Sequence, residues 1–279
     1  MSHPGEVGGG SDPLEKAVAA GTSGRWRPLR DLSNAFGFFT IMPLARAGSM
    51  GEVAGASYLL PFVAAFLGAL EGVTGWGSSQ VFGAPVSAAL VLAAALLLTG
   101  LHHSDGLADL GDALMVHGDA ARRIEVLKDS TMGIGAAGTL FLTYLISWAA
   151  IVEIITLRQG FELVVLIMAA ELSARLCLLL VGSIGRPSHQ GSGSSFADAL
   201  KGWRGLTGIG IALVTLASMV LVVPYQAVLF SVGAVLAVAI LLLVVSRRFF
   251  GGIGGDVLGA SVELGRLAAL LGLLAGLAL

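Results

Sequence analysis

Long runs of apolar residues make up most of the chain, and short polar stretches separate them. A helix needs about 20 predominantly apolar residues to cross the hydrocarbon core of a bilayer. The segments that meet this requirement cover residues 52–75, 83–101, 133–157, 161–184, 206–223, 227–246 and 257–279. The pattern therefore predicts an all-α polytopic membrane helical bundle with about seven transmembrane helices.

Two different patterns precede the first of these segments. Residues 1–30 are rich in glycine, serine, proline and charge, which is typical of a disordered tail. Apolar positions then recur between residues 32 and 42 and end before Pro43. They indicate either an amphipathic helix at the membrane interface or a helix that begins the bundle. We expect residues 31–279 to form a single integral-membrane domain with an N-terminal interfacial helix.

The composition supports a membrane protein and excludes other classes. Only 12% of the 279 residues are charged, about half the share of a soluble domain. The net charge of −2 provides no basic excess for binding nucleic acid. Cys177 is the only cysteine, which excludes an intramolecular disulfide and a cysteine metal cluster.

Lysine and arginine residues gather in alternate polar segments. Cytoplasmic loops carry an excess of these residues, and this bias sets the orientation of membrane proteins. The residues on the favoured side are Lys16, Arg25, Arg27, Arg30, Arg46, Arg122, Arg123, Lys128, Arg186, Lys201, Arg204, Arg247 and Arg248. The opposite side has only Arg158, because Arg175 and Arg266 fall inside spans. The N-terminus and the three long loops should therefore be cytoplasmic, and the C-terminus external.

Three aspartates follow the second apolar segment at positions i, i+4 and i+7. On a helix this spacing places Asp105, Asp109 and Asp112 on one face. We expect this helix to continue the second span, so that the carboxylates lie near the cytoplasmic edge of the hydrocarbon, where unpaired charge is costly. Mg²⁺ takes oxygen ligands and commonly bridges carboxylates to substrate phosphates. A solvated acidic helix end is the alternative, but the spacing and position favour a Mg²⁺ site.

A second acidic group opens the last apolar segment. Asp256 follows a glycine-rich stretch at residues 251–255, and Glu263 lies two turns further along roughly the same helix face. The predicted orientation places Asp256 on the same side as the three aspartates, and glycines would let a substrate approach the backbone closely. Glu263 suits either a substrate contact or a pairing with Arg266.

Several polar residues are candidates for binding phosphate. Lys128, Asp129 and Ser130 precede a glycine, and this mixture suits a phosphate site, because cations neutralise phosphoryl oxygens. Arg186 lies just past the fourth span, at the predicted cytoplasmic mouth. Arg123 is either a substrate ligand or only part of the orientation signal.

Two further residues each have a structural and a functional interpretation. Arg175 lies inside the fourth span with Glu171 one turn earlier, which indicates either an ion pair or a ligand contact. His103 suits a metal ligand or a base, but also a hydrogen-bonded histidine that orients its neighbours. His102, His117 and His189 have no spacing typical of zinc sites.

Three separated motifs resemble the cobalamin synthase family, the adenosylcobinamide-GDP ribazoletransferases. Residues 103–112 (HSDGLADLGD) resemble its HLDGLADTADG signature, and residues 123–133 (RIEVLKDSTMG) resemble RLEIMKDSRIG. The stretch that begins at Gly251 (GGIGGDVLGASVEL) is similar to GGVTGDTLGAAIEL. With a weaker match at residues 38–44, the resemblance covers about residues 34–279 in the family's order.

The resemblance implies a multi-pass cell-membrane transferase of cobalamin biosynthesis with a cytoplasmic active site. Such an enzyme joins adenosylcobinamide-GDP with α-ribazole or its 5′-phosphate, and it releases GMP in a Mg²⁺-dependent reaction. The corrinoid would lie in gaps between spans or at the subunit interface of a homo-oligomer.

The residues of this chain take roles through the matched motifs. The implied Mg²⁺ ligands are Asp105, Asp109, Asp112 and Asp256, while Asp109 is also expected to be essential for catalysis. The implied substrate ligands are Lys128, Ser130, Arg123, Arg175, Arg186 and Glu263. Asp129 and His103 are both candidates for the base that deprotonates the ribazole hydroxyl. Residues 185–193 (GRPSHQGSG) depart from the family's usual AREEGLG, so the glutamate contacts of that loop do not carry over.

Two other functions compete with this one. Membrane CDP-alcohol phosphotransferases also cluster aspartates, but their DxxDGxxAR pattern fails at residues 105–109. A cation-coupled or proton-coupled transporter predicts carboxylates near mid-membrane and an inverted repeat of spans. The sequence shows no repeat, and its carboxylates gather at one end of the helices.

Overall fold

The computed structural model describes residues 28–42, 48–129, 131–188 and 192–279, and this part of the chain is helical without a β-strand. The elements are α2 (Pro28–Phe39), α3 (Met50–Gly55), a 3₁₀ turn η1 (Ser57–Leu59), α4 (Leu60–Ser79), α5 (Ala84–Leu98), α6 (His102–Met115), α7 (Ala120–Leu127), α8 (Ile134–Leu157), α9 (Gly160–Ile184), α10 (Ser192–Leu200), α11 (Trp203–Met219), α12 (Tyr225–Phe250) and α13 (Gly255–Leu277). The tail predicted at residues 1–30 lies outside the described residues except for its last three, which begin α2.

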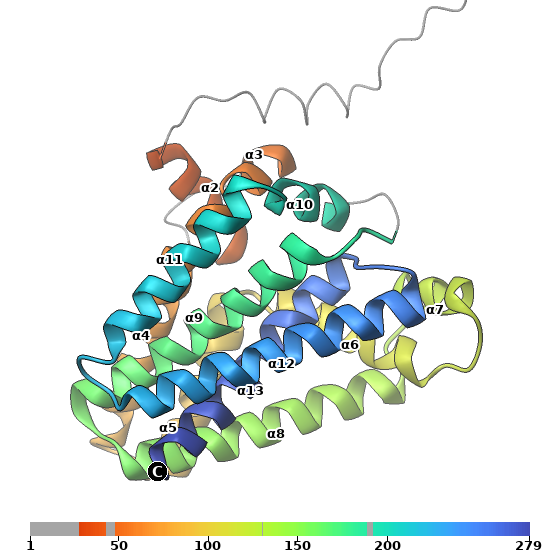
Figure 1. The fold of residues 1–279 in the computed structure, drawn as a ribbon. Helices are drawn as coiled ribbons and strands as arrows, with labels where there is room; N and C mark the ends of the chain where they lie inside the picture. The colour runs from red at the N-terminus through yellow and green to blue at the C-terminus, as the bar shows by residue number, and fades with distance from the viewer. Residues whose placement is uncertain (1–27, 43–47, 130, 189–191) are drawn as a thin grey trace, which may run out of the picture.

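Each predicted span corresponds to a helix, and the structure confirms an all-α polytopic bundle. The helices α4 with η1, α8, α9, α12 and α13 are long and apolar enough to cross a membrane. Helix α11 is apolar but has only 17 residues. The C-terminus lies at the opposite end of the bundle from α2, α3 and α10 (Figure 1).

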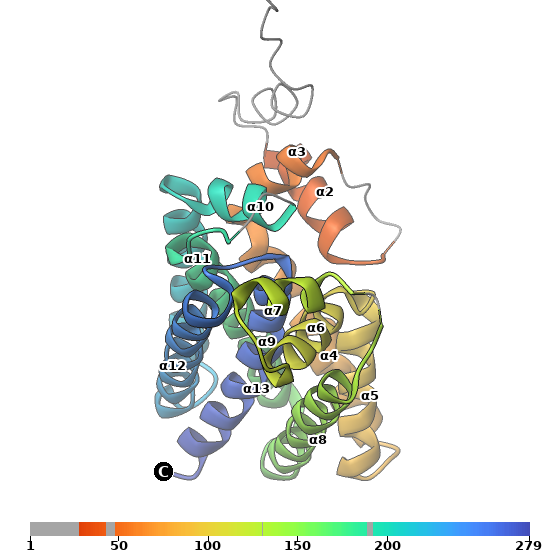
Figure 2. The same cartoon turned by 90° about the vertical axis from the view of Figure 1, so that its right-hand side faces the viewer.

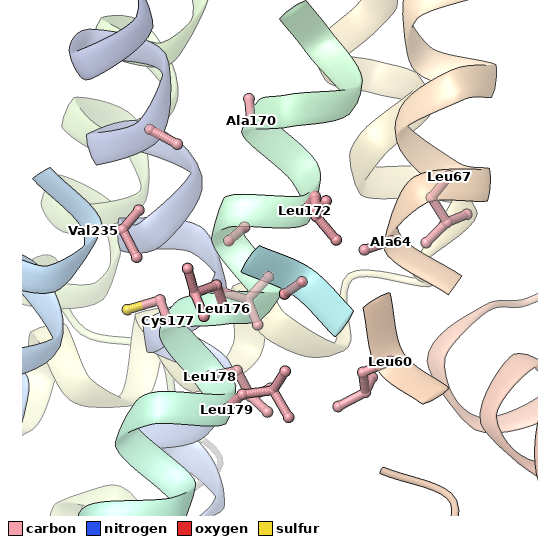
Figure 3. Packing of buried hydrophobic residues seen from close by; sticks show 14 of the residues in the cluster. Leu60, Ala64, Leu67, Ala170, Leu172, Leu176, Cys177, Leu178, Leu179 and Val235 are labelled. Atoms are coloured by element: carbon pink, nitrogen blue, oxygen red, sulfur yellow. The ribbon is translucent and has the colours of Figure 1, made fainter. Parts of the chain in front are cut away.

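Helix α9 forms the centre of the bundle. It packs against α4, α13, α11 and α12, and nearly all of its apolar side chains are buried. Leu172, Leu176 and Leu179 of α9 lie in one apolar cluster with Leu60 and Leu67 of α4 (Figure 3). By contrast, α8 and α12 bury only about a third of their apolar segments and form the outside of the bundle, as lipid contact requires (Figure 2).

Helix α6 confirms that Asp105, Asp109 and Asp112 lie on one helix. The prediction that this helix continues the second span, α5, is wrong. Helix α5 ends in a Schellman motif, in which the N–H of Leu101 donates to the carbonyl of Leu96 and the N–H of Gly100 to that of Leu97. Gly100 and Leu101 adopt left-handed backbone conformations, with φ of 63° and 62°. The chain therefore turns by 94° before α6 begins. Helix α6 leaves the direction of α5, and it is not counted among the spans.

Helix α2 confirms the predicted N-terminal helix with an earlier start. It packs against α3, η1 and α4 at one end of the bundle. Asn34, Ala35 and Phe39 are buried, while Leu29 is exposed. The Tyr58 hydroxyl donates to the Asp31 carboxylate over 2.9 Å, which fixes α2 to the segment that precedes α4.

Candidate active site

Helix α6 packs between α13 and α8, and its contact with α13 joins two of the three sequence motifs. A Cβ atom on Gly106 would lie 2.7 Å from the backbone oxygen of Asp256, so only a glycine permits this approach. The contact brings the first turn of α13 beside the acidic face of α6. Asp256 and the aspartates of α6 therefore lie at one place, as the sequence predicted.

Asp109 is a carboxylate of this acidic face whose pKa is shifted by its surroundings. Its side chain is half-buried, whereas Asp105 is exposed. Burial, and then the carboxylates of Asp105, Asp256 and Asp112, raise the pKa of Asp109 to about 6. A cation bound between these side chains would offset the same repulsion.

Asp112 has a contact that the sequence analysis did not foresee. Its carboxylate accepts hydrogen bonds from the N–H groups of Gly133 (2.6 Å) and Ala136 (2.8 Å) at the start of α8. A carboxylate in this position satisfies free N–H groups and interacts favourably with the helix dipole. Asp112 therefore connects α6 to α8, and its role as a metal ligand stays a prediction.

The carboxylates of this acidic face are chemically suited to Mg²⁺, although they do not by themselves form a complete metal-binding site. Within the described ranges, no three His, Cys, Asp or Glu side chains are arranged to hold a metal ion. Mg²⁺ keeps several waters, however, and is usually bound by one or two carboxylates together with substrate phosphates. Asp105, Asp109 and Asp256 provide carboxylate oxygens and an excess of negative charge.

The loop that carries Arg186 lies against the glycine-rich stretch before α13. The N–H of Ile253 donates to the Arg186 carbonyl over 2.8 Å, and the N–H of Ser188 donates to the Ile253 carbonyl over 3.0 Å. These bonds form an isolated parallel bridge between Pro187 and Ile253. The exposed Arg186 is thereby held near the start of α13, because its hydrogen-bond partner Ile253 precedes Asp256 by three residues.

The residues after α7 are at the surface. Lys128 is exposed, and Asp129 accepts hydrogen bonds from the hydroxyl (2.7 Å) and the N–H (2.9 Å) of Thr131. These bonds hold the pKa of Asp129 below its usual value, so that it stays ionised at neutral pH. Ser130 lies outside the described residues.

Arg123 makes structural contacts. Its guanidinium donates to the carbonyls of Ala113 (2.7 Å) and Leu114 (3.0 Å) at the end of α6. It also lies 4.9 Å from the centre of the Phe249 ring, at cation–π distance. These contacts connect α6, α7 and α12. They give the guanidinium of Arg123 partners within the protein, with no ligand needed.

Arg175 and Glu263 lie inside the bundle, away from its surface. Arg175 pairs with Glu171 over 2.5 Å, and Arg266 bridges Glu171 (2.8 Å) and Glu263 (2.5 Å). Every side chain of this network is at most 5% exposed. The ion pairs account for the burial of these charges, so a substrate contact of either residue stays a prediction. Glu71, also buried near this network, was missed, although a lone acid within an apolar segment is a signal for such a position.

His103 lies at the start of α6 with its ring buried. Burial lowers the pKa of His103 well below its usual value, and the nearby positive charges of Arg175 and Arg266 lower it further. The imidazole is therefore neutral at physiological pH. The Phe39 ring stacks on it at 6.3 Å with an interplanar angle of 14°.

Comparison with known proteins gives a consistent result. Residues 31–274 match the family model described as cobalamin-5-phosphate synthase, CobS. The adenosylcobinamide-GDP ribazoletransferase of Halorubrum lacusprofundi is 35% identical over 253 residues, which cover 87% of this chain and 95% of that protein. The enzyme of the same name from Methanocella arvoryzae is 32% identical over 258 residues, covering 87% and 94%. No solved structure matches the chain.

Proposed function

Because the chain belongs to the cobalamin-5-phosphate synthase family, a family of transferases in cobalamin synthesis, we propose that it joins adenosylcobinamide-GDP with α-ribazole or its 5′-phosphate. In this reaction the ribazole hydroxyl oxygen bonds to the phosphorus that carries the cobinamide. The bond from that phosphorus to the bridging oxygen of the diphosphate breaks, and GMP leaves. The hydroxyl proton passes to a base.

The convergence of Asp105, Asp109 and Asp256 is the observation that supports this chemistry most directly. A diphosphate carries several negative charges, and carboxylates alone would repel it. One or two of these carboxylates would hold Mg²⁺ together with phosphate oxygens of the substrate, and the bound cation would neutralise negative charge on the diphosphate and on the departing GMP. Burial raises the pKa of Asp109 most, and the carboxylates of Asp105, Asp256 and Asp112 raise it further; such a cation would offset the contribution of these charges.

The other side chains have roles consistent with their positions. Arg186 is exposed beside the start of α13, where its guanidinium would contact phosphate oxygens. Lys128 is exposed at the end of α7 and would add a second positive charge. His103 is neutral and Asp129 is ionised, so either would accept the ribazole proton.

The orientation of this site belongs to the same proposal. We place the acidic face of α6 on the cytoplasmic side of the cell membrane, where nucleotides are available. The supporting observation is the distribution of lysine and arginine along the sequence, with Arg158 alone in the loops of the other side.

An assay with purified protein in detergent tests the proposal. Adenosylcobinamide-GDP and α-ribazole are supplied together, and GMP and the corrinoid product are measured with Mg²⁺ and with a chelator. We expect GMP and the joined corrinoid in equal amounts, only when Mg²⁺ is present. Absence of corrinoid product contradicts the proposed reaction, and full activity in the chelator contradicts the metal.

A further inference from the structure

A small pocket with aromatic walls adjoins the acidic face of α6. It has a volume of about 150 Å³ and lies between α9 and the ends of α2, α6, α10 and α13. Its walls include Phe38 and Phe39 of α2, His103 of α6, Phe196 of α10, and Leu258 and Gly259 of α13. We call this set of residues the aromatic pocket.

The rings of the aromatic pocket are held in fixed relative orientations. Phe39 lies nearly parallel to His103, and it meets Phe196 at 64° with a centroid distance of 5.9 Å. Buried rings in such stacked and edge-on arrangements favour another flat aromatic group over a flexible aliphatic chain. The pocket therefore suits a planar ring.

One polar atom of a residue that lines the pocket has an unsatisfied hydrogen-bonding capacity. The Nδ1 atom of His103 is buried and has no hydrogen-bond partner among the described residues. The His103 side chain as a whole is only 6% exposed. A buried ring nitrogen without a partner is unfavourable, and a ligand with one matching polar atom would satisfy it.

The pocket is also placed correctly for a reactant. His103 precedes Asp105 by two residues, and Gly255, which also lines the pocket, precedes Asp256. Helix α13 also packs against α6 here, since a Cβ on Gly259 would lie 3.4 Å from the His103 carbonyl, at van der Waals distance. A ring in the pocket would therefore have its attached sugar near the carboxylates.

We propose that the aromatic pocket binds the dimethylbenzimidazole ring of α-ribazole, and that His103 Nδ1 pairs with the free nitrogen of that ring. This inference rests on the proposed function. An enclosed apolar cavity of about 150 Å³ holds a benzene-sized ring. This pocket has the same volume but is partly open, so a bicyclic ring can enter with one edge toward the opening, whereas the corrin macrocycle is far too large. Guanine is excluded by polarity, because burying its amino, carbonyl and ring N–H groups would leave most of them unpaired.

A matched pair of substitutions on α2 tests the ring contact. Phe39→Leu removes the stacking ring, whereas Phe36→Leu makes the same change where the ring packs against Phe66 instead. We expect F39L to raise the KM for α-ribazole about 3- to 10-fold, with the KM for adenosylcobinamide-GDP unchanged. F36L should leave both values unchanged. Thermal unfolding in detergent shows whether both variants fold.

An altered ligand tests the hydrogen bond without altering the ring contacts. The indole analogue of α-ribazole replaces the free ring nitrogen with C–H. Wild-type protein should bind it about 3- to 10-fold more weakly than α-ribazole, as measured by calorimetry without the second substrate. His103→Leu should bind both compounds equally, since the partner of the nitrogen is then absent.

The outcomes separate this inference from the proposed function. If wild-type protein forms the corrinoid product but F39L leaves the KM for α-ribazole unchanged, the pocket assignment is wrong and the proposed reaction stands. An increase only in the KM for adenosylcobinamide-GDP would assign the pocket to the other substrate and overturn the inference. If no product forms while F39L still weakens the binding of α-ribazole, the reaction fails and the pocket assignment is supported.

Discussion

Asp109 carries its charge half-buried on α6, with three other carboxylates within electrostatic reach. Asp109→Asn removes the charge and keeps the shape of the side chain. We expect GMP release to fall by about 100-fold or more, because a metal ligand at the reacting diphosphate is lost. The midpoint of thermal unfolding should not fall, since the repulsion among the carboxylates decreases. Activity near the wild-type level would remove Asp109 from the metal site.

The same residue predicts how Mg²⁺ dependence changes with pH. The folded-state pKa of Asp109 is about 6, above its ordinary value of 3.8, so protons compete with Mg²⁺ for this carboxylate as the pH falls through 6. The Mg²⁺ concentration that gives half-maximal GMP release should therefore be several-fold higher at pH 5.5 than at pH 7.5. The raised pKa of Asp109 also determines how its contribution to the stability of the fold changes with pH. A raised folded-state pKa stabilises the apo protein at low pH, and this contribution disappears as the pH rises through 6. A Mg²⁺ requirement independent of pH would show that Asp109 does not bind the metal.

The site depends on the close approach of two helices, α6 and α13, at Gly106. Gly106→Ala places a methyl group 2.7 Å from the backbone oxygen of Asp256, so one helix must shift. We expect G106A to lose most of its activity and to unfold at a lower temperature. Gly138→Ala on α8 is the matched control, because a Cβ there meets nothing within 4 Å. Alanine is about 1 kcal/mol more favourable than glycine within a helix, so G138A should be active and at least as stable. Equal activity of the two variants would contradict the importance of this contact.

The elements also show how far the sequence alone could predict the structure. Apolar runs are sufficient to locate spans, because a helix that crosses a membrane must be apolar along its whole length. The turn at Gly100 was missed, although a glycine at the end of an apolar run is a signal for a helix C-terminus. Helix α10 was missed because it is short and lies within a polar segment, so its few apolar residues, such as Phe196, show no clear period.

The same limit applies to the candidate site. The proximity of Asp105, Asp109 and Asp256 was predictable, because their motifs are local and the alternation of spans puts both motifs at the same end of the bundle. The cap formed by Asp112 and the contacts of Arg123 were not, because each depends on an element distant in sequence. The aromatic pocket is lined by residues of five helices, α2, α6, α9, α10 and α13, and no spacing within the sequence predicts it.

For the whole molecule, the orientation of the bundle decides which compartment supplies the substrates. A single-cysteine design can determine it, because Cys177 is buried and is the only cysteine. In a Cys177→Ser background, His117→Cys places a thiol on the exposed loop after α6, and Gln80→Cys places one at the far end of α4. Positive residues predict that the loop after α6 is cytoplasmic. A membrane-impermeant maleimide should therefore label H117C only in inside-out vesicles and Q80C only in intact cells, while C177S alone stays unlabelled. The reverse pattern would place the acidic face of α6 outside the cell, where neither GDP-activated substrate nor cytoplasmic Mg²⁺ is supplied, and the proposed orientation would have to be abandoned.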